Sequence, residues 1–219
     1  LQKGILYRTY KVQLDIMCTM EDADDKWAAY YARLKDRPPR FTSVFATRRF
    51  CKPGFAVDLG AGGGRDALPL LTAGWRVLAI DREPAAIAAI QNAVPNDLLP
   101  ALSVAQQNLE EAEWPECDLL NSSFALPLCK KMEFPNVWQK IINRLGAGGR
   151  FSGQLYGDRD TWAKDGAEDG VVAFTRSACL AQLNRFDIEF FEEEEHDGVT
   201  PRGKIKHWHI FHIVARKCS

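Results

Sequence analysis

The sequence has no C-x-x-C pair and no large excess of charge of either sign. Its six cysteines are scattered over 219 residues, and the formal net charge is only −1. Scattered cysteines favour a reducing compartment over a disulfide framework or a zinc site, so we expect a cytoplasmic protein without a bound metal. A nearly neutral chain also gives no electrostatic reason to expect binding to nucleic acid or to an anionic membrane.

Long apolar segments are missing as well. No run of about 18 apolar residues occurs, so no transmembrane helix is expected. The first 20 residues lack the apolar core of a signal peptide, which is roughly 7–15 residues long. The printed chain starts at Leu1, and Met17 and Met20 are both candidates for the natural start. We therefore assign no function to the extension formed by residues 1–20.

The chain does have the length and apolar content of one folded domain. A chain of 219 residues, of which 46% are hydrophobic, is long enough to bury a full α/β core. We predict a single domain over residues 21–219. Within it, residues 21–50 are expected to form helices, the first of which carries Trp27 and Tyr31 on its apolar stripe. These two side chains are candidates for a lid over a bound ligand, and packing on the flank of the sheet is an equally good explanation.

The most informative stretch runs from residue 55 to residue 81. It reads as a buried strand at Phe55–Leu59, a glycine-rich turn, a helix at 65–73 and a second strand that ends just before Asp81. Glycines in such a turn permit positive φ angles and a close approach of the backbone to a ligand. Asp81 lies 21 residues beyond Gly60, near the offset of about 20 residues at which an acid meets a ribose hydroxyl pair. The stretch therefore predicts a nucleoside-binding site.

Two residues decide which nucleoside fits. A dinucleotide-binding turn has a third glycine that lets the helix pack closely, and here Arg65 occupies that position. Asp58, inside the first strand, would repel a pyrophosphate but attract an ammonium group. The segment AVDLGAGGGRD around these residues resembles motif I of the class I S-adenosylmethionine-dependent methyltransferases. That resemblance implies a Rossmann-like α/β fold with a seven-stranded, mostly parallel sheet, an antiparallel last strand and helices on both faces.

The same resemblance implies a binding site for S-adenosylmethionine. Asp58 and the glycine turn are expected to hold the methionine end, while Arg65 either pairs with its carboxylate or caps the strand–helix junction. Asp81 is expected to bind the ribose. Asn108 is expected to bind the adenine, since its amide both accepts and donates hydrogen bonds, with a simple turn asparagine as the alternative. The predicted cofactor-binding residues are Asp58, Gly60, Gly62, Gly64, Arg65, Asp81, Arg82, Asn108, Leu109, Asn121 and Ser122.

The segment after the fourth predicted strand is expected to form the floor of the reaction centre. Ligands of a doubly wound sheet lie beyond the carboxyl ends of its strands, and the strand at Cys117–Asn121 ends here. Methyltransferases that act on amino groups of nucleic acids and proteins often carry two prolines at this point, and this chain has none. We therefore expect a small-molecule acceptor. Candidate substrate-pocket residues are Ser123, Phe124, Tyr156 and His207, together with Trp27 and Tyr31.

The carboxyl-terminal region carries a more specific resemblance. From VVAFTRSACL to the terminal ARK, the sequence looks like the tellurite-resistance (TehB-type) methyltransferases, which have a histidine in a connecting loop. By matching position, His196 falls on that histidine and Lys204 on a basic residue that follows it. Both are therefore candidate catalytic residues, with His196 as a base or a substrate-orienting group. Asp197 replaces an arginine beside the histidine, which argues against direct transfer to an oxyanion such as tellurite or selenite.

Three of the four histidines lie in the last predicted strand. Side-chain alternation puts His207 and His209 on one face and His212 on the other. We expect His207 and the loop at 196–204 to lie above the donor methyl, and His212 to be a core residue. The acidic run Glu192–Glu195 is expected to be a solvated edge, because four adjacent side chains cannot converge on one cation.

These patterns together predict an S-adenosylmethionine-dependent methyltransferase with a small-molecule acceptor such as a thiol or a chalcogen oxyanion. A donor-binding protein without catalysis, such as a sensor or an assembly subunit, is one alternative. A nicotinamide-dependent oxidoreductase is a second, which Asp58 and Arg65 disfavour. The sequence does not identify the attacking atom of the acceptor. It is equally compatible with a monomer and a homodimer.

Overall fold

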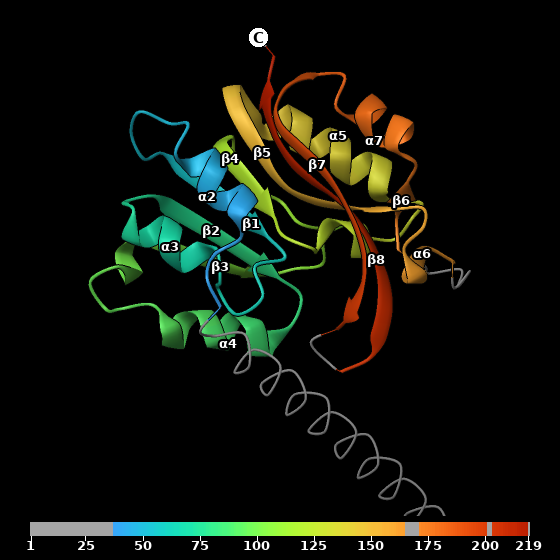
Figure 1. The fold of residues 1–219 in the computed structure, drawn as a ribbon. Coiled ribbons are helices and arrows are strands. Elements are labelled where there is room, and N and C mark those ends of the chain that lie inside the picture. Colours follow the sequence, from blue (N-terminus) through green and yellow to red (C-terminus); the bar gives the residue numbers. More distant parts are fainter. Residues whose placement is uncertain (1–36, 165–170, 201–202, 219) are drawn as a thin grey trace, which may run out of the picture.

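The computed structural model describes residues 37–164, 171–200 and 203–218. These residues form one mixed sheet with helices on both of its faces (Figure 1). The helix predicted at 21–35, with Trp27 and Tyr31, lies outside the described residues. Within the described ranges, no helix is long and apolar enough to cross a membrane.

The sheet contains eight strands among the described residues, in the order β3-β2-β1-β4-β5-β8-β7, with the short β6 paired to β5. The strands from β3 to β5 are parallel to their neighbours, whereas β8 is antiparallel to both β5 and β7. This is the predicted Rossmann-like arrangement with one additional short strand. The strands are β1 (Phe55–Leu59), β2 (Arg76–Asp81), β3 (Leu102–Gln106), β4 (Cys117–Ser122), β5 (Leu145–Gly157), β6 (Ala173–Phe174), β7 (Phe186–Val199) and β8 (Ile205–Lys217).

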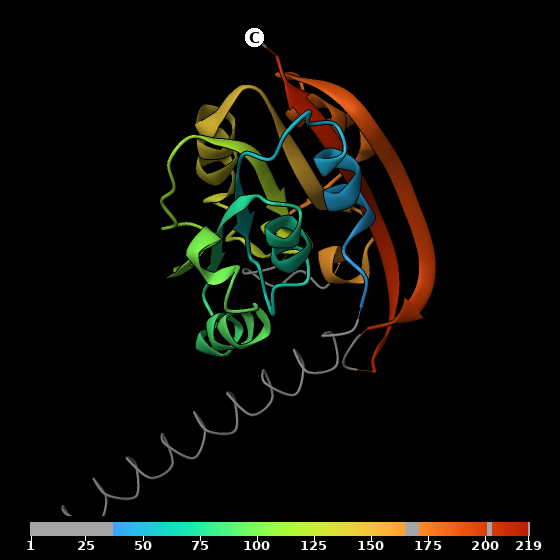
Figure 2. The same ribbon diagram turned by 90° about the vertical axis from the view of Figure 1, so that its left-hand side faces the viewer.

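The helices cover the two faces of the sheet and divide the apolar core into two clusters. Val137 and Trp138 of α5 belong to one cluster, while Ala46 of α2, Leu70 of α3 and Ile90 of α4 belong to the other. Figure 2 shows α2 and α5 on opposite sides of β5. The helices are α2 (Phe41–Thr47), α3 (Ala67–Thr72), α4 (Pro84–Ala93), α5 (Phe134–Arg144), α6 (Thr161–Lys164) and α7 (Arg176–Gln182), with short 3₁₀ turns η1 (Leu99–Ala101) and η2 (Leu126–Leu128).

Local sequence signals explain where several helices begin. Pro84 and Pro135 lie in the first turns of α4 and α5, where a missing backbone N–H costs no helical hydrogen bond. Thr175 is the N-cap of α7, since its Oγ1 accepts a hydrogen bond from the backbone N–H of Ala178 at 3.2 Å. By contrast, α3 begins at Ala67 and not at the predicted Arg65, because the glycine turn extends through both Arg65 and Asp66.

Two predicted boundaries in the carboxyl-terminal half are wrong. The segment Gly146–Gly149 contains three glycines, and from its sequence alone we expect a turn before a strand that starts at Arg150. In the structure it lies within β5, where the pairing with β4 shifts register. The acidic run Glu192–Glu195 and His196 lie within β7, although the latter was predicted in a loop. Alternate glutamates of the run pair with cations on one face, for example Glu193 with Arg176 at 2.8 Å. Because these charges are partly neutralised, the strand continues, and its acidic side chains also discourage edge-to-edge pairing of the outermost strand.

Gly153 gives a direct test of the packing between β4 and β5. A Cβ atom at this position would lie 2.4 Å from the carbonyl oxygen of Ser122 on β4, whereas one at Gly146 would meet no atom closer than 3.4 Å. We expect Gly153→Ala to lower the free energy of unfolding by about 1–3 kcal/mol, the usual cost of overpacking. Urea denaturation measures this, with Gly146→Ala in the same strand as the control. Equal stability of the two variants would contradict the described packing.

Candidate functional site

A glycine turn closes the carboxyl end of β1. Gly60, Gly62 and Gly64 all have positive φ angles of 54–83°, which residues with a Cβ rarely adopt. At Gly60 a Cβ would also lie 2.1 Å from the Cβ of Ala125. The backbone N–H of Gly60 donates to the carbonyl oxygen of Ile80 on β2 at 2.8 Å. The turn is therefore bound to the neighbouring strand and exposes its remaining backbone groups to the space beyond the sheet.

Asp58 lies at the end of β1, beneath this turn, with 2% of its surface exposed. Its Oδ1 accepts a hydrogen bond from Asn121 Nδ2 of β4 at 2.8 Å, while its Oδ2 has no hydrogen-bond partner among the described residues. Burial and the nearby carboxylate of Asp66 raise the pKa of Asp58 to about 8. A buried carboxylate with one unpartnered oxygen favours a ligand that brings a positive charge and a hydrogen-bond donor.

Asp81 lies at the end of β2, on the other side of the glycine turn. Its Oδ2 accepts from the backbone N–H of Gly62 at 2.8 Å, and its Oδ1 accepts from that of Glu83 at 3.0 Å. These two bonds fix the orientation of the carboxylate. Each oxygen has a second lone pair, so the group still has the capacity to accept from a diol. Arg82 forms a salt bridge of 3.0 Å with Glu83 at the mouth of the site.

The segment before α2 is attached to the glycine turn. Arg65 Nε donates to the carbonyl oxygen of Pro38 at 2.6 Å, and the backbone N–H of Arg40 donates to Asp66 Oδ1 at 2.7 Å. Arg65, which is predicted to pair with the methionine carboxylate of the donor, is therefore held in place by Pro38, far from it in the sequence. This contact also brings Arg40 to the site.

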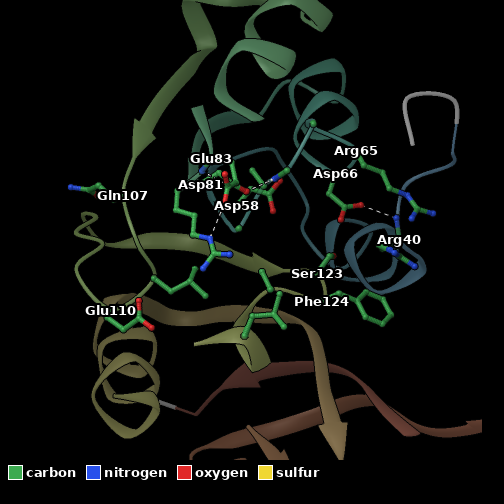
Figure 3. Close-up of a pocket in the computed structure, with 18 residues that line it drawn as sticks. Arg40, Asp58, Arg65, Asp66, Asp81, Glu83, Gln107, Glu110, Ser123 and Phe124 are labelled. Atoms are coloured by element: carbon green, nitrogen blue, oxygen red, sulfur yellow. Dashed lines mark hydrogen bonds and ion pairs between the residues drawn. The ribbon is translucent and has the colours of Figure 1, made fainter. Parts of the chain in front are cut away.

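These elements enclose a cleft of about 230 Å³ (Figure 3). Figure 3 shows Asp58, Asp81 and Glu83 on one side of it and Arg40 with Phe124 on another. The structure brings together most of the residues predicted at the donor and acceptor ends of the site. The predicted residues that line the cleft are Asp58, Gly60, Gly62, Arg65, Asp81, Arg82, Leu109, Ser123 and Phe124.

Four predicted cofactor residues are not part of the cleft lining. Two of them act beneath it: Asn121 holds Asp58, and Ser122 Oγ donates to the carbonyl oxygen of Leu59 at 2.9 Å. Gly64 packs against α4, and Asn108 turns its amide toward Glu111 at 3.5 Å. The four residues are Gly64, Asn108, Asn121 and Ser122.

The end of the cleft predicted to hold adenine is lined instead by Gln107, Leu109 and Glu110. Glu110 Oε1 accepts from the backbone N–H of Lys130 at 2.7 Å, which helps to hold its pKa below the ordinary value despite partial burial. Asn108 lies between these lining residues, beyond the end of β3 at Gln106, and its role in binding the adenine stays a prediction. The lining also includes Ala61 and Gly63 of the predicted glycine turn and Ala125 of the predicted floor segment. The other lining residues that sequence reasoning missed are Arg40, Asp66, Glu83 and Leu128.

Phe124 is the one residue other than glycine with a positive φ, 59°, among the described residues. Such a backbone conformation is costly for a bulky side chain and is typical of functional sites. Its ring lines the cleft and lies 4.2 Å from the guanidinium carbon of Arg40. The rings of Tyr156 and Trp208 are centred 6.3 and 6.5 Å from it. The strain therefore places an aromatic ring between the cleft and an aromatic cluster on the end of the sheet.

The two candidate catalytic residues lie outside the lining of this cleft. His196 is in β7, where its Nδ1 lies 3.1 Å from Glu194 Oε1 and about half of the side chain, 48%, is exposed. Lys204 lies in the hairpin between β7 and β8, exposed, with its backbone N–H bonded to Thr200 Oγ1. Their catalytic roles stay predictions.

The predicted positions of two histidines in β8 need correction. His207, expected near the donor methyl, points to the face opposite Trp208 and Phe124 and bonds Asp197 at 2.7 Å. The carboxylates of Glu195 and Asp197 raise its pKa. His212, expected in the core, is only partly buried and directs its ring toward Phe124, at 6.3 Å between ring centres. The alternation was correct, but the strand pattern does not tell which face meets the cleft.

Comparison with known proteins agrees with this geometry. A Rossmann-like sheet with a glycine turn and acids at the ends of β1 and β2 has the architecture of class I methyltransferases. The chain belongs to the TehB family: the model of the tellurite resistance protein TehB matches residues 25–151. The comparison with curated protein sequences gave no match.

Solved structures of methyltransferases share the fold at low sequence identity. TehB from Haemophilus influenzae has a TM-score of 0.68 and 16% identity over 81% of this chain, which spans 62% of that protein. The 1,6-didemethyltoxoflavin-N1-methyltransferase of Burkholderia thailandensis, solved with its substrate and S-adenosylhomocysteine, has a TM-score of 0.62 and 19% identity. The aligned parts are 95% of this chain and 88% of that one. The glycopeptide N-methyltransferase MtfA, complexed with S-adenosyl-L-methionine, has a TM-score of 0.57 and 17% identity over 84% and 96% of the two chains.

The raised pKa of Asp58 predicts how the stability of the empty protein depends on pH. The folded-state value of about 8 exceeds the ordinary value of 3.8, so this group stabilises the fold fully below about pH 4. That stabilisation is lost as the pH rises toward 8. Asp58→Asn keeps the acceptor for Asn121 and removes the titration. We expect the unfolding free energy of the variant, relative to wild type, to increase by about 2 kcal/mol or more between pH 5 and pH 8. A pH-independent difference in urea denaturation would contradict the raised pKa.

Proposed function

We propose that the protein is an S-adenosylmethionine-dependent methyltransferase that acts on a small-molecule acceptor. The observation that carries the proposal is the unpartnered Oδ2 of Asp58 in the cleft. A methionine ammonium supplies both the charge and the donor that this buried oxygen lacks. The group thus fits the residues present, and family membership supports the same assignment.

The chain's own residues divide the donor site into three parts. Asp58 and the glycine turn would hold the ammonium end, and Arg65 would face the carboxylate. Asp81, already oriented by the backbone of Gly62, would accept from the ribose diol, while the Gln107–Glu110 segment would surround the adenine. The bound donor would supply an electrophilic methyl group on sulfur. The described part of the predicted covering segment supports this arrangement, because Arg40 closes one side of the cleft.

The acceptor side is supported by the position of Phe124 at the boundary between the cleft and the aromatic cluster. A small acceptor placed there would be aligned for attack on the methyl carbon, and such alignment supplies much of the rate acceleration in reactions of this kind. The described cysteines are free thiols, which supports a reducing, cytoplasmic location.

Two other functions remain as alternatives. A donor-binding protein without catalysis would bind the ligand but methylate no acceptor in a panel of thiols, chalcogen oxyanions and small amines. A nicotinamide-dependent oxidoreductase is opposed by Arg65 at the third glycine position and by Asp58 where a pyrophosphate would lie. Quenching of NADH fluorescence on titration would favour it.

Calorimetry with two ligands tests the donor site. S-adenosylhomocysteine carries the amino-acid group, whereas 5′-methylthioadenosine carries only the nucleoside. At pH 7.5 we expect Asp58→Asn to weaken binding of the first at least about tenfold, the effect of losing one charge-assisted hydrogen bond. Binding of the second should change less than about twofold.

Asp81→Asn is the matched variant at the ribose end. It retains the size of the side chain and is expected to weaken both ligands by a similar factor, because both contain the ribose. Absence of any binding by the wild-type protein would contradict the proposed function. An equal loss of both ligands in Asp58→Asn would contradict the assignment of Asp58 to the ammonium group.

A further inference from the structure

His212 and Glu194 form a hydrogen-bonded pair next to the strained Phe124. The Nε2 of His212 lies 2.6 Å from Glu194 Oε2, and only 18% of the histidine side chain is exposed. The ring of His212 packs edge-on against Phe124, with 6.3 Å between ring centres and 76° between planes. Phe124 itself lines the donor cleft. One aromatic ring therefore connects this pair to the cleft.

The network fixes which nitrogen of His212 carries the proton. An ionised glutamate only accepts hydrogen bonds, so the proton of the neutral imidazole is assigned to Nε2, which donates to Glu194. Nδ1 then carries a lone pair. Within the described residues, this nitrogen has no hydrogen-bond partner. The histidine is thus oriented by a carboxylate, with its basic nitrogen available to another molecule.

His196, the histidine matched by sequence, depends on the same carboxylate. Its Nδ1 lies 3.1 Å from Oε1 of Glu194, so this glutamate connects the two histidines. Far more of the His196 side chain is exposed than of His212, 48% against 18%. Among the described residues, only His212 of the two has a ring contact with Phe124. Neither histidine lines the cleft, but His212 contacts the lining residue Phe124, so the geometry favours His212 over His196 as the group next to an acceptor.

We propose that His212 is the catalytic base of the reaction and that Glu194 positions it; this rests on the proposed function. Nδ1 takes the proton of the acceptor's X–H group, and the electron pair of that bond stays on X. The acceptor atom X then forms a bond to the methyl carbon, while the pair of the broken C–S bond leaves with sulfur. The imidazolium that results is stabilised by Glu194.

The charges around His212 indicate the class of acceptor. Glu192 lies directly opposite it in the β7–β8 pairing, and β5 presents the neutral Gln154 opposite it on the other side. Two carboxylates next to one histidine repel an anionic acceptor. The acceptor is therefore a neutral molecule whose nucleophilic atom carries a proton, such as a thiol. The charged and titratable groups that face His212 or its ring neighbour are Glu192, Glu194, His196 and Arg40.

A pair of thiols separates base catalysis from a structural role. At pH 7, 2-mercaptoethanol is mostly protonated and needs a base, whereas 4-nitrothiophenol is already ionised. We expect His212→Asn to slow methylation of the first by about 100-fold or more and to change that of the second by less than about threefold. Imidazole in solution should partly restore the first rate. Equal slowing of both thiols, or of neither, would overturn the proposal. A selective loss in His196→Asn with full activity of His212→Asn would assign the base to His196.

A second measurement does not depend on turnover. The ¹⁵N chemical shifts of His212 should show a proton on Nε2 and a bare Nδ1 in the wild-type protein. Glu194→Gln should remove this preference and reduce turnover of 2-mercaptoethanol. A glutamine amide both donates and accepts hydrogen bonds, so it no longer requires a proton on Nε2 of His212. A proton resident on Nδ1 in the neutral wild-type protein would overturn the proposal.

Binding of S-adenosylhomocysteine by His212→Asn shows that the variant is folded and distinguishes the two ways of failing. If the wild-type protein does not bind S-adenosylhomocysteine, the proposed function itself is contradicted. If the wild-type protein binds this ligand but methylates neither thiol, His212 is not a base for thiols. That result favours a donor-binding protein without catalysis.

Discussion

The buried carboxylate of Asp58 is the constraint on which the site depends. Burial and the nearby like charge of Asp66 make its ionised form unfavourable in the empty protein, although Asn121 donates a hydrogen bond to it across the β1–β4 pair. Such a group lowers the stability of the fold at neutral pH and is retained where a ligand compensates for it. The turn above Asp58 requires glycine at position 60 for two reasons. A side chain there would collide with Ala125, and the positive φ angle opens the backbone toward the ligand. A cation that reaches Oδ2 relieves the repulsion and completes the hydrogen bonding.

Neighbouring strands of the sheet carry different kinds of functional side chain at the ends that face the cleft. β1 and β2 carry the acids, the segment after β4 carries Phe124, and β5 and β8 provide the aromatic cluster beside it. The strained backbone of Phe124 is maintained because its ring is enclosed by Arg40, Tyr156, Trp208 and His212. The cleft and the aromatic cluster are thus adjacent because parallel strands end at one edge of the sheet and the antiparallel β8 begins there.

Much of the fold and of the donor site could be predicted from sequence because the signals are local. β1 has the predicted bounds. The alternation of apolar residues and the spacing of the glycines are patterns formed by residues that are close together in the sequence. Three features depend on long-range contacts that no local pattern encodes. The approach of Arg40 requires the hydrogen bond between Arg65 and Pro38. The choice of the cleft-facing side of β8, which exchanged the expected positions of His207 and His212, depends on how β8 pairs with β5. The continuation of β7 through four glutamates depends on cations supplied by other segments, such as Arg159.

The most direct test of the account is the number of protons released when S-adenosylhomocysteine binds at pH 7. It is obtained from calorimetry in buffers with different ionisation enthalpies. Asp58, with a pKa of about 8 in the empty protein, is mostly protonated at this pH and must ionise to pair with the ammonium group. We expect release of about one proton by the wild-type protein and of almost none by Asp58→Asn. Tight binding by the wild type without proton release would contradict it.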